Sequence, residues 1–242
     1  MPHAGPDWGT YAPASTIYSL QDLGELAARI GSFVNFDRLG NVIAMDNFEN
    51  GIGEWYSDGD AGFSADWDSK YCRLGGFSCK LTTGPSAGNT VKITKHIGAP
   101  VLSAMGVEVS FSYEQNWRYL DIFLDLYDGT YYYGAALRFD HTTAKLQYKD
   151  SAGAFQDIAG GFYYGTELPH DFDTLKIVAD FTTVKYKRLL VNNLVFDLSE
   201  ISFLKDVSTN TPALTVQLRL TTSANAAAIA YIDDVIVTQN EP

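Results

Sequence analysis

The segment from residue 117 to residue 127, WRYLDIFLDLY, alternates aliphatic side chains with aromatic and acidic ones. Successive side chains of a β-strand point to opposite faces, so one face would carry Tyr119, Asp121, Phe123, Asp125 and Tyr127, with Trp117 at its entrance. Aromatic rings stack on a pyranose, carboxylates accept hydrogen bonds from its hydroxyls, and a few polar groups among rings are typical of a ligand site. The segment is therefore a candidate sugar-binding platform. The open alternative is that the rings pack under a helix or against another subunit, because aromatic residues are also enriched at interfaces.

Hydrolysis of a glycosidic bond would need a different arrangement, in which two carboxyl groups lie roughly 5 to 9.5 Å apart. Glu108, Glu114, Asp121 and Asp125 fall on predicted strands and are the available acids. The sequence contains no Glu-x-Asp-x-x-Glu, Gly-x-Ser-x-Gly or His-Glu-x-x-His motif and no phosphate-binding loop, and its four histidines are scattered. We therefore expect a protein that is not an enzyme, with glycoside hydrolysis as the open alternative.

The charge balance excludes one class of partner. Acidic residues outnumber basic ones by 29 to 17, which gives a formal net charge of −12. A protein that binds nucleic acid usually carries a basic stripe that neutralises phosphates, and none occurs here, so we expect no nucleic-acid partner. No run approaches the roughly 20 apolar residues of a membrane-spanning helix, so no membrane association is expected. The first residues, MPHAGPDWGTYAPAS, do not have the basic and apolar regions of a signal peptide.

Two cysteines occur, both in the segment YCRLGGFSCKL. If Gly75 and Gly76 form a two-residue hairpin turn, Cys72 and Cys79 pair across the hairpin. Their Cα atoms would then lie about 5.5 Å apart, a spacing that a disulfide allows. Two interpretations remain open, a disulfide between Cys72 and Cys79 or two reduced thiols. A metal site at these cysteines is not expected, because no nearby histidine completes a tetrahedral shell.

Residues 1–32 differ in character from the rest of the chain. Residues 1–16 contain three prolines among small and polar residues, which is typical of an extended arm. The segment SLQDLGELAARIG predicts one short helix, which Ser19 caps and Gly31 ends. An apolar stripe on this helix consists of Leu20, Leu23, Leu26, Ala27 and Ile30. Two interpretations remain open: the stripe packs on the protein's own core, or arm and helix dock onto a neighbouring subunit.

From Phe33 onward the hydrophobic period changes to two, as in VEVSFSY, TLKIVADF, LTVQLRLTT and AIAYIDDVIVT. Turn-forming residues separate these runs at 127–130, 150–153, 159–161, 192–193 and 208–212. Many short alternating strands with turns between them predict an antiparallel β-sandwich. The sequence therefore predicts an all-β fold, with an arm and helix over residues 1–32 and a single sandwich domain over residues 33–242.

Several local phrases resemble those of jelly-roll carbohydrate-binding modules and the related concanavalin-like sandwiches. They are DNFENGIGEW, GGFSCKLTTG, DTLKIVADFTTVKYKRLLVNNLVFDLS and YIDDVIVT, and their order spans most of residues 44–238. The resemblance implies an antiparallel jelly-roll β-sandwich. Function does not follow from it, because this sandwich serves sugar binding, catalysis and virion assembly alike.

The same resemblance implies a structural calcium site, which is found in such modules. Glu49 opens the predicted sandwich and Asp233 closes it, and the first and last strands of these sandwiches commonly lie side by side. Glu49 and Asp233 are therefore the best candidate ligands, with Asp46 and Asp234 behind them, because calcium is bound by carboxylate and carbonyl oxygens. The open alternative is a solvated acidic patch at the edge of a strand.

The arm together with FDRLGNVIAMDNFE also resembles, more faintly, the beginning of bacteriophage structural proteins, in which a jelly roll follows an attachment segment. The sequence then predicts a non-enzymatic virion protein, either a capsid decoration or a tail component. Its partners would be its own subunits or other virion proteins, contacted through Leu20, Leu23, Leu26 and Ile30, and it could also bind a glycan. The alternative is a carbohydrate-binding module of a secreted or cell-surface protein. Both place the protein in a virion or outside the cell.

Overall fold

The computed structural model of the protein describes residues 39–98, 100–162 and 170–242. The predicted arm and helix of residues 1–32, with Leu20, Leu23, Leu26 and Ile30, lie outside the described residues. Within the described part of the chain every regular element is a β-strand. No helix in that part is long and apolar enough to cross a membrane.

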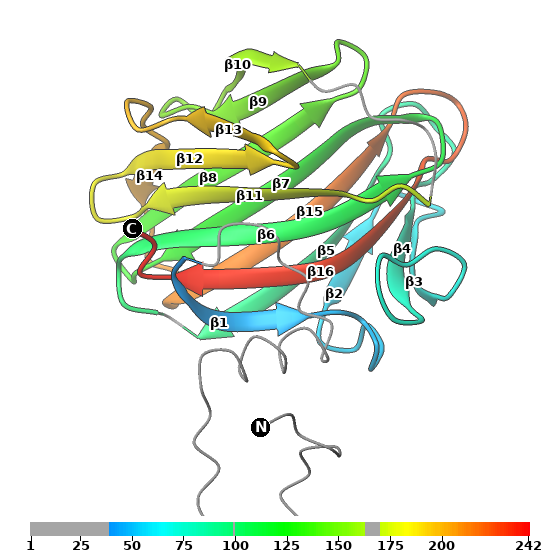
Figure 1. The fold of residues 1–242 in the computed structure, drawn as a ribbon, viewed down its shortest axis with the longest axis horizontal. Helices are drawn as coiled ribbons and strands as arrows, with labels where there is room; N and C mark the ends of the chain where they lie inside the picture. The colour runs from blue at the N-terminus through cyan, green and yellow to red at the C-terminus, as the bar shows by residue number, and fades with distance from the viewer. Residues whose placement is uncertain (1–38, 99, 163–169) are drawn as a thin grey trace, which may run out of the picture. The chain divides into compact units, whose positions relative to one another are not determined.

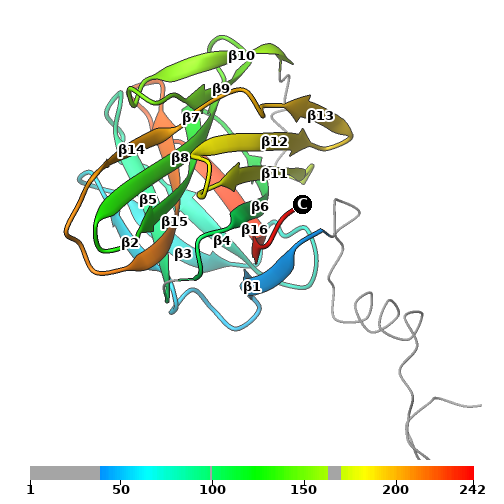
Figure 2. The same ribbon diagram turned by 90° about the vertical axis from the view of Figure 1, so that its left-hand side faces the viewer.

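The strands form two antiparallel sheets of eight strands each, and the predicted all-β jelly-roll sandwich is confirmed. Sheet A has the order β13 (Leu194–Asp197), β12 (Lys185–Val191), β11 (Asp173–Asp180), β6 (Ala104–Tyr113), β16 (Ile229–Gln239), β4 (Ser78–Thr82), β3 (Ser64–Asp68), with β1 (Asn41–Asp46) also paired to β16. Sheet B has the order β10 (Phe155–Phe162), β9 (Lys145–Lys149), β8 (Tyr131–Asp140), β7 (Trp117–Tyr127), β15 (Ala213–Thr222), β5 (Thr90–Gly98), β2 (Tyr56–Gly59), with β14 (Leu204–Val207) also paired to β8. The two sheets lie face to face (Figures 1 and 2).

The core lies between the two inner faces and follows from the alternation of side chains along each strand. Strand β6 contributes Val107, Val109 and Phe111, which are completely buried. From the opposite sheet, β7 contributes the aliphatic side chains Leu120, Ile122, Leu124 and Leu126. Burial of this apolar surface drives the two sheets together. The alternate residues of β7 are consequently presented on the outer face of sheet B.

Most of the predicted turns separate strands as expected. Residues 127–130 connect β7 to β8, residues 150–153 connect β9 to β10, and Asn192 and Asn193 connect β12 to β13. The prediction of a turn at 159–161 is wrong, because β10 continues to Phe162. Its pairing with β9 is irregular between Asp157 and Phe162, so the glycines of this segment mark a distorted strand instead of a turn.

Strand β16 occupies the middle of sheet A. It pairs with β6 along one edge, and with β4 and then β1 along the other. The expectation that the first and last strands lie side by side is therefore confirmed. The pairing with β6 is interrupted between Asp233 and Ile236, where Asp234 has a φ of 47°. This bulge displaces the two aspartates from the regular register.

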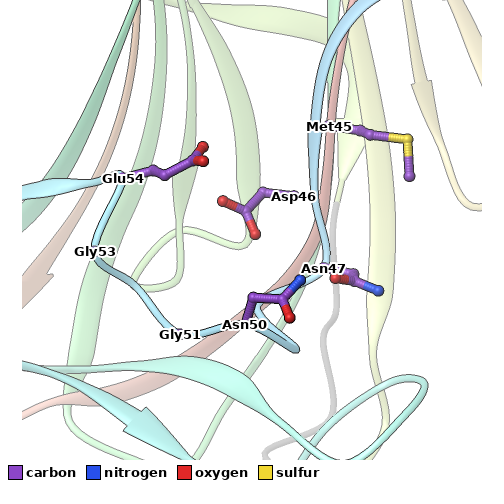
Figure 3. Close-up of a pocket in the computed structure, with 7 residues that line it drawn as sticks. All are labelled: Met45, Asp46, Asn47, Asn50, Gly51, Gly53 and Glu54. Atoms are coloured by element: carbon purple, nitrogen blue, oxygen red, sulfur yellow. The ribbon is translucent and has the colours of Figure 1, made fainter.

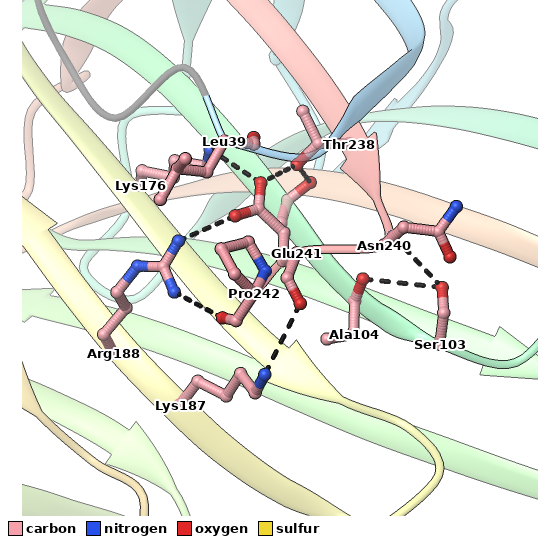
Figure 4. Close-up of polar contacts among 11 residues, drawn as sticks. Leu39, Ser103, Ala104, Lys176, Lys187, Arg188, Thr238, Asn240, Glu241 and Pro242 are labelled. Carbon is pink, nitrogen blue, oxygen red and sulfur yellow. Dashed lines mark hydrogen bonds and ion pairs between the residues drawn. The ribbon is translucent and has the colours of Figure 1, made fainter.

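The end of the chain is fixed on the outer face of sheet A (Figure 4). The Glu241 carboxylate is fully buried and lies 2.7 Å from the Lys176 ammonium and 2.8 Å from the Arg188 guanidinium. The Thr238 hydroxyl also donates to Glu241, at 2.5 Å. Arg188 donates a further hydrogen bond to the carbonyl of Pro242 at 2.9 Å. Three strands, β11, β12 and β16, are thus held together through a single buried carboxylate.

Glu108 of β6 lies on the same outer face, opposite Lys176 of β11. Burial raises the pKa of its carboxyl to about 7, against the opposing effects of Lys176 and Arg73 and with the support of Asp234 and Glu241. Its Oε1 atom makes no hydrogen bond with any residue that the structure describes. A buried carboxyl without a full set of partners favours its neutral form.

Candidate functional site

Strand β7 lies near the centre of sheet B, paired with β8 on one side and β15 on the other. The predicted alternation is confirmed for most of the strand: the aliphatic residues enter the core, while Tyr119, Asp121, Phe123, Asp125 and Tyr127 lie on the opposite face. Because neighbouring strands flank β7, the side chains of β8 and β15 surround these residues. The predicted platform therefore corresponds to the outer face of sheet B.

The prediction that Trp117 stands at the entrance to this platform is wrong. Trp117 is only 1% exposed and belongs to the core. Its ring centroid lies 4.3 Å from that of Tyr113 and 4.6 Å from that of His141. The register between β7 and β15 shifts at Thr221 and Thr222, so that Arg118 is an additional residue in β7. One additional residue reverses the alternation, which turns the indole inward.

Asp121 is held in place on the outer face of sheet B by two arginines. Its side chain is fully buried, and its register partners on the two flanking strands are Arg138 of β8 and Arg219 of β15. Arg138 donates from Nε at 2.6 Å and from Nη2 at 3.0 Å. Arg219 donates from Nε at 3.0 Å and from Nη2 at 2.5 Å. Asp121 thus compensates its burial by charge-assisted hydrogen bonds from both sides.

Aromatic rings lie against both guanidinium groups. The Arg138 guanidinium carbon is 4.0 Å from the ring centroid of Tyr119 and 3.8 Å from that of Phe155 in β10. The Arg219 guanidinium carbon is 4.8 Å from the ring centroid of Phe123. Cation–π contacts of this kind stabilise an arginine and limit its rotamers. Guanidinium and ring therefore form one continuous, ordered surface.

Asp125 and its surroundings form the second part of this face. The Tyr132 hydroxyl of β8 donates to Asp125 Oδ1 at 2.9 Å, and the Tyr127 and Tyr132 ring centroids are 5.1 Å apart. Burial raises the pKa of Asp125 to about 6, while the hydrogen bond from Tyr132 and the charge of Lys149 oppose the rise. Burial and the Asp125 carboxylate also raise the pKa of Tyr132. Neither tyrosine is poised to lose its proton near neutral pH.

The acids that could have served hydrolysis do not form a catalytic pair. Asp121 is held by two arginines. Asp125 lies four positions farther along the strand, about 13 Å away, which exceeds the spacing of glycosidase carboxyls. Glu108 lies on sheet A. Glu114 forms an ion pair with Lys70 at 2.7 Å and accepts a hydrogen bond from Tyr231. Asp121 and Asp125 therefore do not form a glycosidase pair on the outer face of sheet B.

Two of the predicted calcium ligands converge on the loop of residues 69–77, but as acceptors of N–H groups. Glu49 Oε1 accepts hydrogen bonds from the backbone N–H groups of Gly76 at 2.8 Å and Phe77 at 3.0 Å. Asp233 Oδ2 accepts from the backbone N–H of Arg73 at 2.8 Å. Burial and the neighbouring Asp234 raise the pKa of Asp233 to about 7. N–H donors occupy oxygen atoms that a cation would need.

The other two predicted ligands have cationic partners. Asp234 lies 3.4 Å from the Arg73 guanidinium, and Asp46 lies 3.3 Å from the Lys95 ammonium. Within the described residues, no group of three or more His, Cys, Asp or Glu side chains is arranged to hold a metal ion. The four acids therefore do not form a calcium ligand set in this arrangement, and calcium binding stays a prediction.

The cysteines do not face each other. Cys79 pairs with Trp67 of β3, because β4 begins at Ser78 and the connection from β3 is the loop of residues 69–77 instead of a two-residue hairpin turn. Both thiols are free, so of the two open interpretations the reduced one holds. Cys72 is partly exposed, with its Sγ 3.5 Å from the carbonyl oxygen of Gly75. Burial raises the pKa of the Cys79 thiol to about 12.

Sequence reasoning did not find a cavity of about 350 Å³ in the loop between β1 and β2 (Figure 3). Asp46 and Glu54 point toward one another across this loop, whereas Met45 points away from it. The Lys95 ammonium lies between the two carboxylates, 3.3 Å from Asp46 and 2.5 Å from Glu54. This one ammonium offsets part of the negative charge of the two carboxylates. The remaining lining residues are Asn47, Asn50, Gly51 and Gly53.

No family model matches the sequence, and no curated protein sequence matches it. Solved structures do resemble the fold. The cellulose-induced protein Cip1 is 14% identical, with a TM-score of 0.56 over 81% of this chain and 96% of Cip1. An endo-β-1,4-glucuronan lyase from Trichoderma reesei is 9% identical, with a TM-score of 0.58 over 82% of this chain and 96% of the lyase.

A third similar structure is a carbohydrate esterase from the Shiga toxin-encoding bacteriophage phi24B. It is 14% identical, with a TM-score of 0.52 over 84% of this chain and 100% of the esterase. At such identities the likeness shows the fold and not the activity. The expected resemblance to the carbohydrate-related jelly-roll sandwiches is thus confirmed at the level of the fold.

Proposed function

We propose that the protein binds a carbohydrate without cleaving it and that the outer face of sheet B is the binding surface. The observation that carries the proposal is the ordered row of rings and guanidinium groups around the buried Asp121. Tyr119 of β7 and Phe155 of β10, both partly exposed, supply ring faces. Sugar rings present apolar C–H faces to aromatic rings and hydroxyls to polar groups, and this surface offers both kinds of contact.

The alternative explanation for outward-facing rings was that they pack against a helix or another subunit. An interface core is usually depleted of aspartate, glutamate and lysine, whereas this face carries Asp121 and Asp125 within its aromatic area. Arg138 and Arg219 retain exposed side-chain fractions of 17% and 29%. On this surface, charged and apolar side chains lie next to one another. Such a surface suits a ligand that carries both polar and apolar groups, as a sugar does.

Similar structures named as a lyase and an esterase raise the possibility of catalysis on this face. Proton abstraction near neutral pH requires a base whose pKa is close to 7 or a neighbouring group that accepts its proton. Asp125 comes nearest to this requirement, because burial raises its pKa to about 6, but it already accepts a hydrogen bond from Tyr132. The pKa values of Tyr127 and Tyr132 are raised, and Asp121 is committed to two arginines. The described side chains of this face therefore favour binding over bond cleavage.

A glycan array followed by isothermal titration calorimetry tests the proposal. We expect binding to at least one polysaccharide and recovery of the intact ligand by mass spectrometry. Tyr119→Ala should lose up to about tenfold in affinity, because a stacked ring contributes roughly 0.5 to 1.5 kcal/mol beyond the area that it buries. Trp67→Ala is the matched control, since Trp67 is a half-exposed aromatic residue on sheet A. Absence of binding to all glycans would overturn the proposal, and cleaved products would contradict the non-enzymatic part of it.

A second candidate function is a structural role in a virion, as a capsid decoration or tail component with residues 1–32 as the attachment segment. Support comes from the faint resemblance of the first part of the chain to phage structural proteins and from the likeness of the fold to a protein of bacteriophage phi24B. The proposed partners are its own subunits or other virion proteins. Deletion of residues 1–32 should leave glycan binding intact and abolish attachment to the particle. Normal attachment by the truncated protein would exclude this role for the arm.

A further inference from the structure

The two arginines that flank Asp121 have hydrogen-bonding capacity left over. A guanidinium group has five N–H donors, and a carboxylate matches only one of its edges at a time. Asp121 takes the edge formed by Nε and Nη2 from both Arg138 and Arg219. The Nη1 atoms of both arginines donate to no residue that the structure describes. Each arginine therefore retains an edge that matches a second carboxylate.

The local charge also favours an anionic ligand. Three cationic side chains act on the two acids of this face: Arg138 and Arg219 on Asp121, and Lys149 on Asp125. The sum is 3 − 2, or +1 with Asp125 ionised. The chain as a whole has a net charge of −12, so this is a local cationic area on an acidic protein. Such an area attracts anions selectively.

Both arginines are positioned before any ligand arrives. Arg138 lies between the rings of Tyr119 and Phe155, and Arg219 lies against Phe123, while Asp121 fixes the other edge of each. Ordering two free arginine side chains on binding would carry an entropic cost for each of them. The fold has already ordered them. A preorganised pair of guanidinium groups beside sugar-stacking rings is suited to a sugar that carries a carboxylate.

We propose that the ligand of this face is a polysaccharide that contains uronic acid units, and that the carboxylates of these units bind the free edges of Arg138 and Arg219. This proposal rests on the function proposed above and specifies its ligand class. The pyranose ring stacks on Tyr119 or Phe155, and its carboxylate binds Nη1 of the adjacent arginine. Arg138 and Arg219 are then the residues that determine specificity.

Two oligosaccharides of equal length that differ only at C6 provide the test. Hexamers of β-1,4-linked glucuronic acid and of β-1,4-linked glucose are titrated by calorimetry into the full chain. We expect the acidic hexamer to bind about tenfold more tightly or better at low salt, with a preference that shrinks as salt is added. Equal or tighter binding of the neutral hexamer would overturn the acidic preference and leave the proposed function standing. Failure of both hexamers and of the whole glycan array would overturn both.

A matched pair of variants locates the recognition. Arg219→Gln should reduce affinity for the acidic hexamer about tenfold and thereby reduce the ratio of acidic to neutral affinity. Lys185→Gln is the control, because Lys185 is an exposed cation on sheet A that pairs with Glu200. Circular dichroism and thermal melting verify that both variants fold. Unchanged affinity of a folded Arg219→Gln protein for the acidic hexamer would overturn the assignment of Arg219, and the comparison of the two ligands on the unaltered protein does not depend on either variant.

Discussion

Removal of the Glu241 carboxylate should destabilise the sandwich strongly, although the residue is the second to last of the chain. Glu241→Ala leaves Lys176, whose side chain is 2% exposed, without its closest anion at 2.7 Å. Loss of one partner of a buried ion pair costs about 3 to 5 kcal/mol. Lys176 keeps a contact of 3.3 Å with the carbonyl of Leu39 and lies opposite Glu108. These groups partly compensate, so we expect the lower end, about 3 kcal/mol.

Thermal unfolding followed by circular dichroism measures this effect. For a protein of this size, 1 kcal/mol corresponds to about 2 to 4 °C, so the melting temperature of Glu241→Ala should fall by about 6 to 12 °C. Glu200→Ala is the control, because Glu200 forms an ion pair with Lys185 but its side chain is 91% exposed, and such pairs contribute about 0 to 1 kcal/mol. In a Lys176→Met background, which removes the buried ammonium, Glu241→Ala should lower the free energy of unfolding by far less. A melting temperature of Glu241→Ala within about 1 °C of the unaltered protein would refute the reasoning.

Three further predictions concern protonation, calcium and the thiols. The pKa of Glu108 and that of Asp233 are raised to about 7 in the folded state, so their contribution to stability is complete below about pH 4 and is lost as the pH rises through about 7. Thermal melts at several pH values should therefore show a smaller loss between pH 5 and pH 8 for Glu108→Gln than for the unaltered protein, and an identical loss would contradict this. If the loop of residues 69–77 rearranges into the predicted calcium site, millimolar calcium should raise the melting temperature in a thermal-shift assay and EDTA should reverse the rise, whereas an unchanged melting temperature would contradict calcium binding. An alkylating reagent should modify Cys72 in the native protein and the buried Cys79 only after unfolding, and a disulfide found by mass spectrometry would contradict the free thiols.

The alternation of β7 could be predicted because it is a local property. Side chains two residues apart share a face whatever the partner strands are, so Asp121 and Phe123 were assigned to the same face without a structure. The direction of Trp117 could not be predicted in this way, because it depends on one additional residue in β7 that shifts the register with β15. A bulge of this kind is set by the pairing of two strands distant in sequence, and a single segment does not reveal it.

The partners of Asp121 could not be predicted for a related reason. Arg138 follows Asp121 by 17 residues and Arg219 follows it by 98 residues, and only the pairing of β7 with β8 and β15 brings the three together. A partial signal exists, because both arginines stand between inward-facing residues in LRFD and LRLT. The sequence predicts that Glu49 and Asp233 come together, and in the structure both accept hydrogen bonds from the loop of residues 69–77. The chemistry differs from that of the predicted calcium site, because backbone N–H groups cannot be read from residue types.

The central position of β16 in sheet A has a consequence for how the protein is made. Among the described strands β16 is synthesised last, yet it pairs with β6, β4 and β1, all of which leave the ribosome earlier. Sheet A therefore cannot close until β16 is made. Until then the backbone N–H and C=O groups along one edge of β6 have no partner strand, and such an edge can pair with other chains. Such long-range closure is intrinsically slow. A nascent chain that stops before residue 229 should aggregate instead of persisting as a partly folded sandwich, so the yield of soluble protein depends on how quickly this one strand inserts.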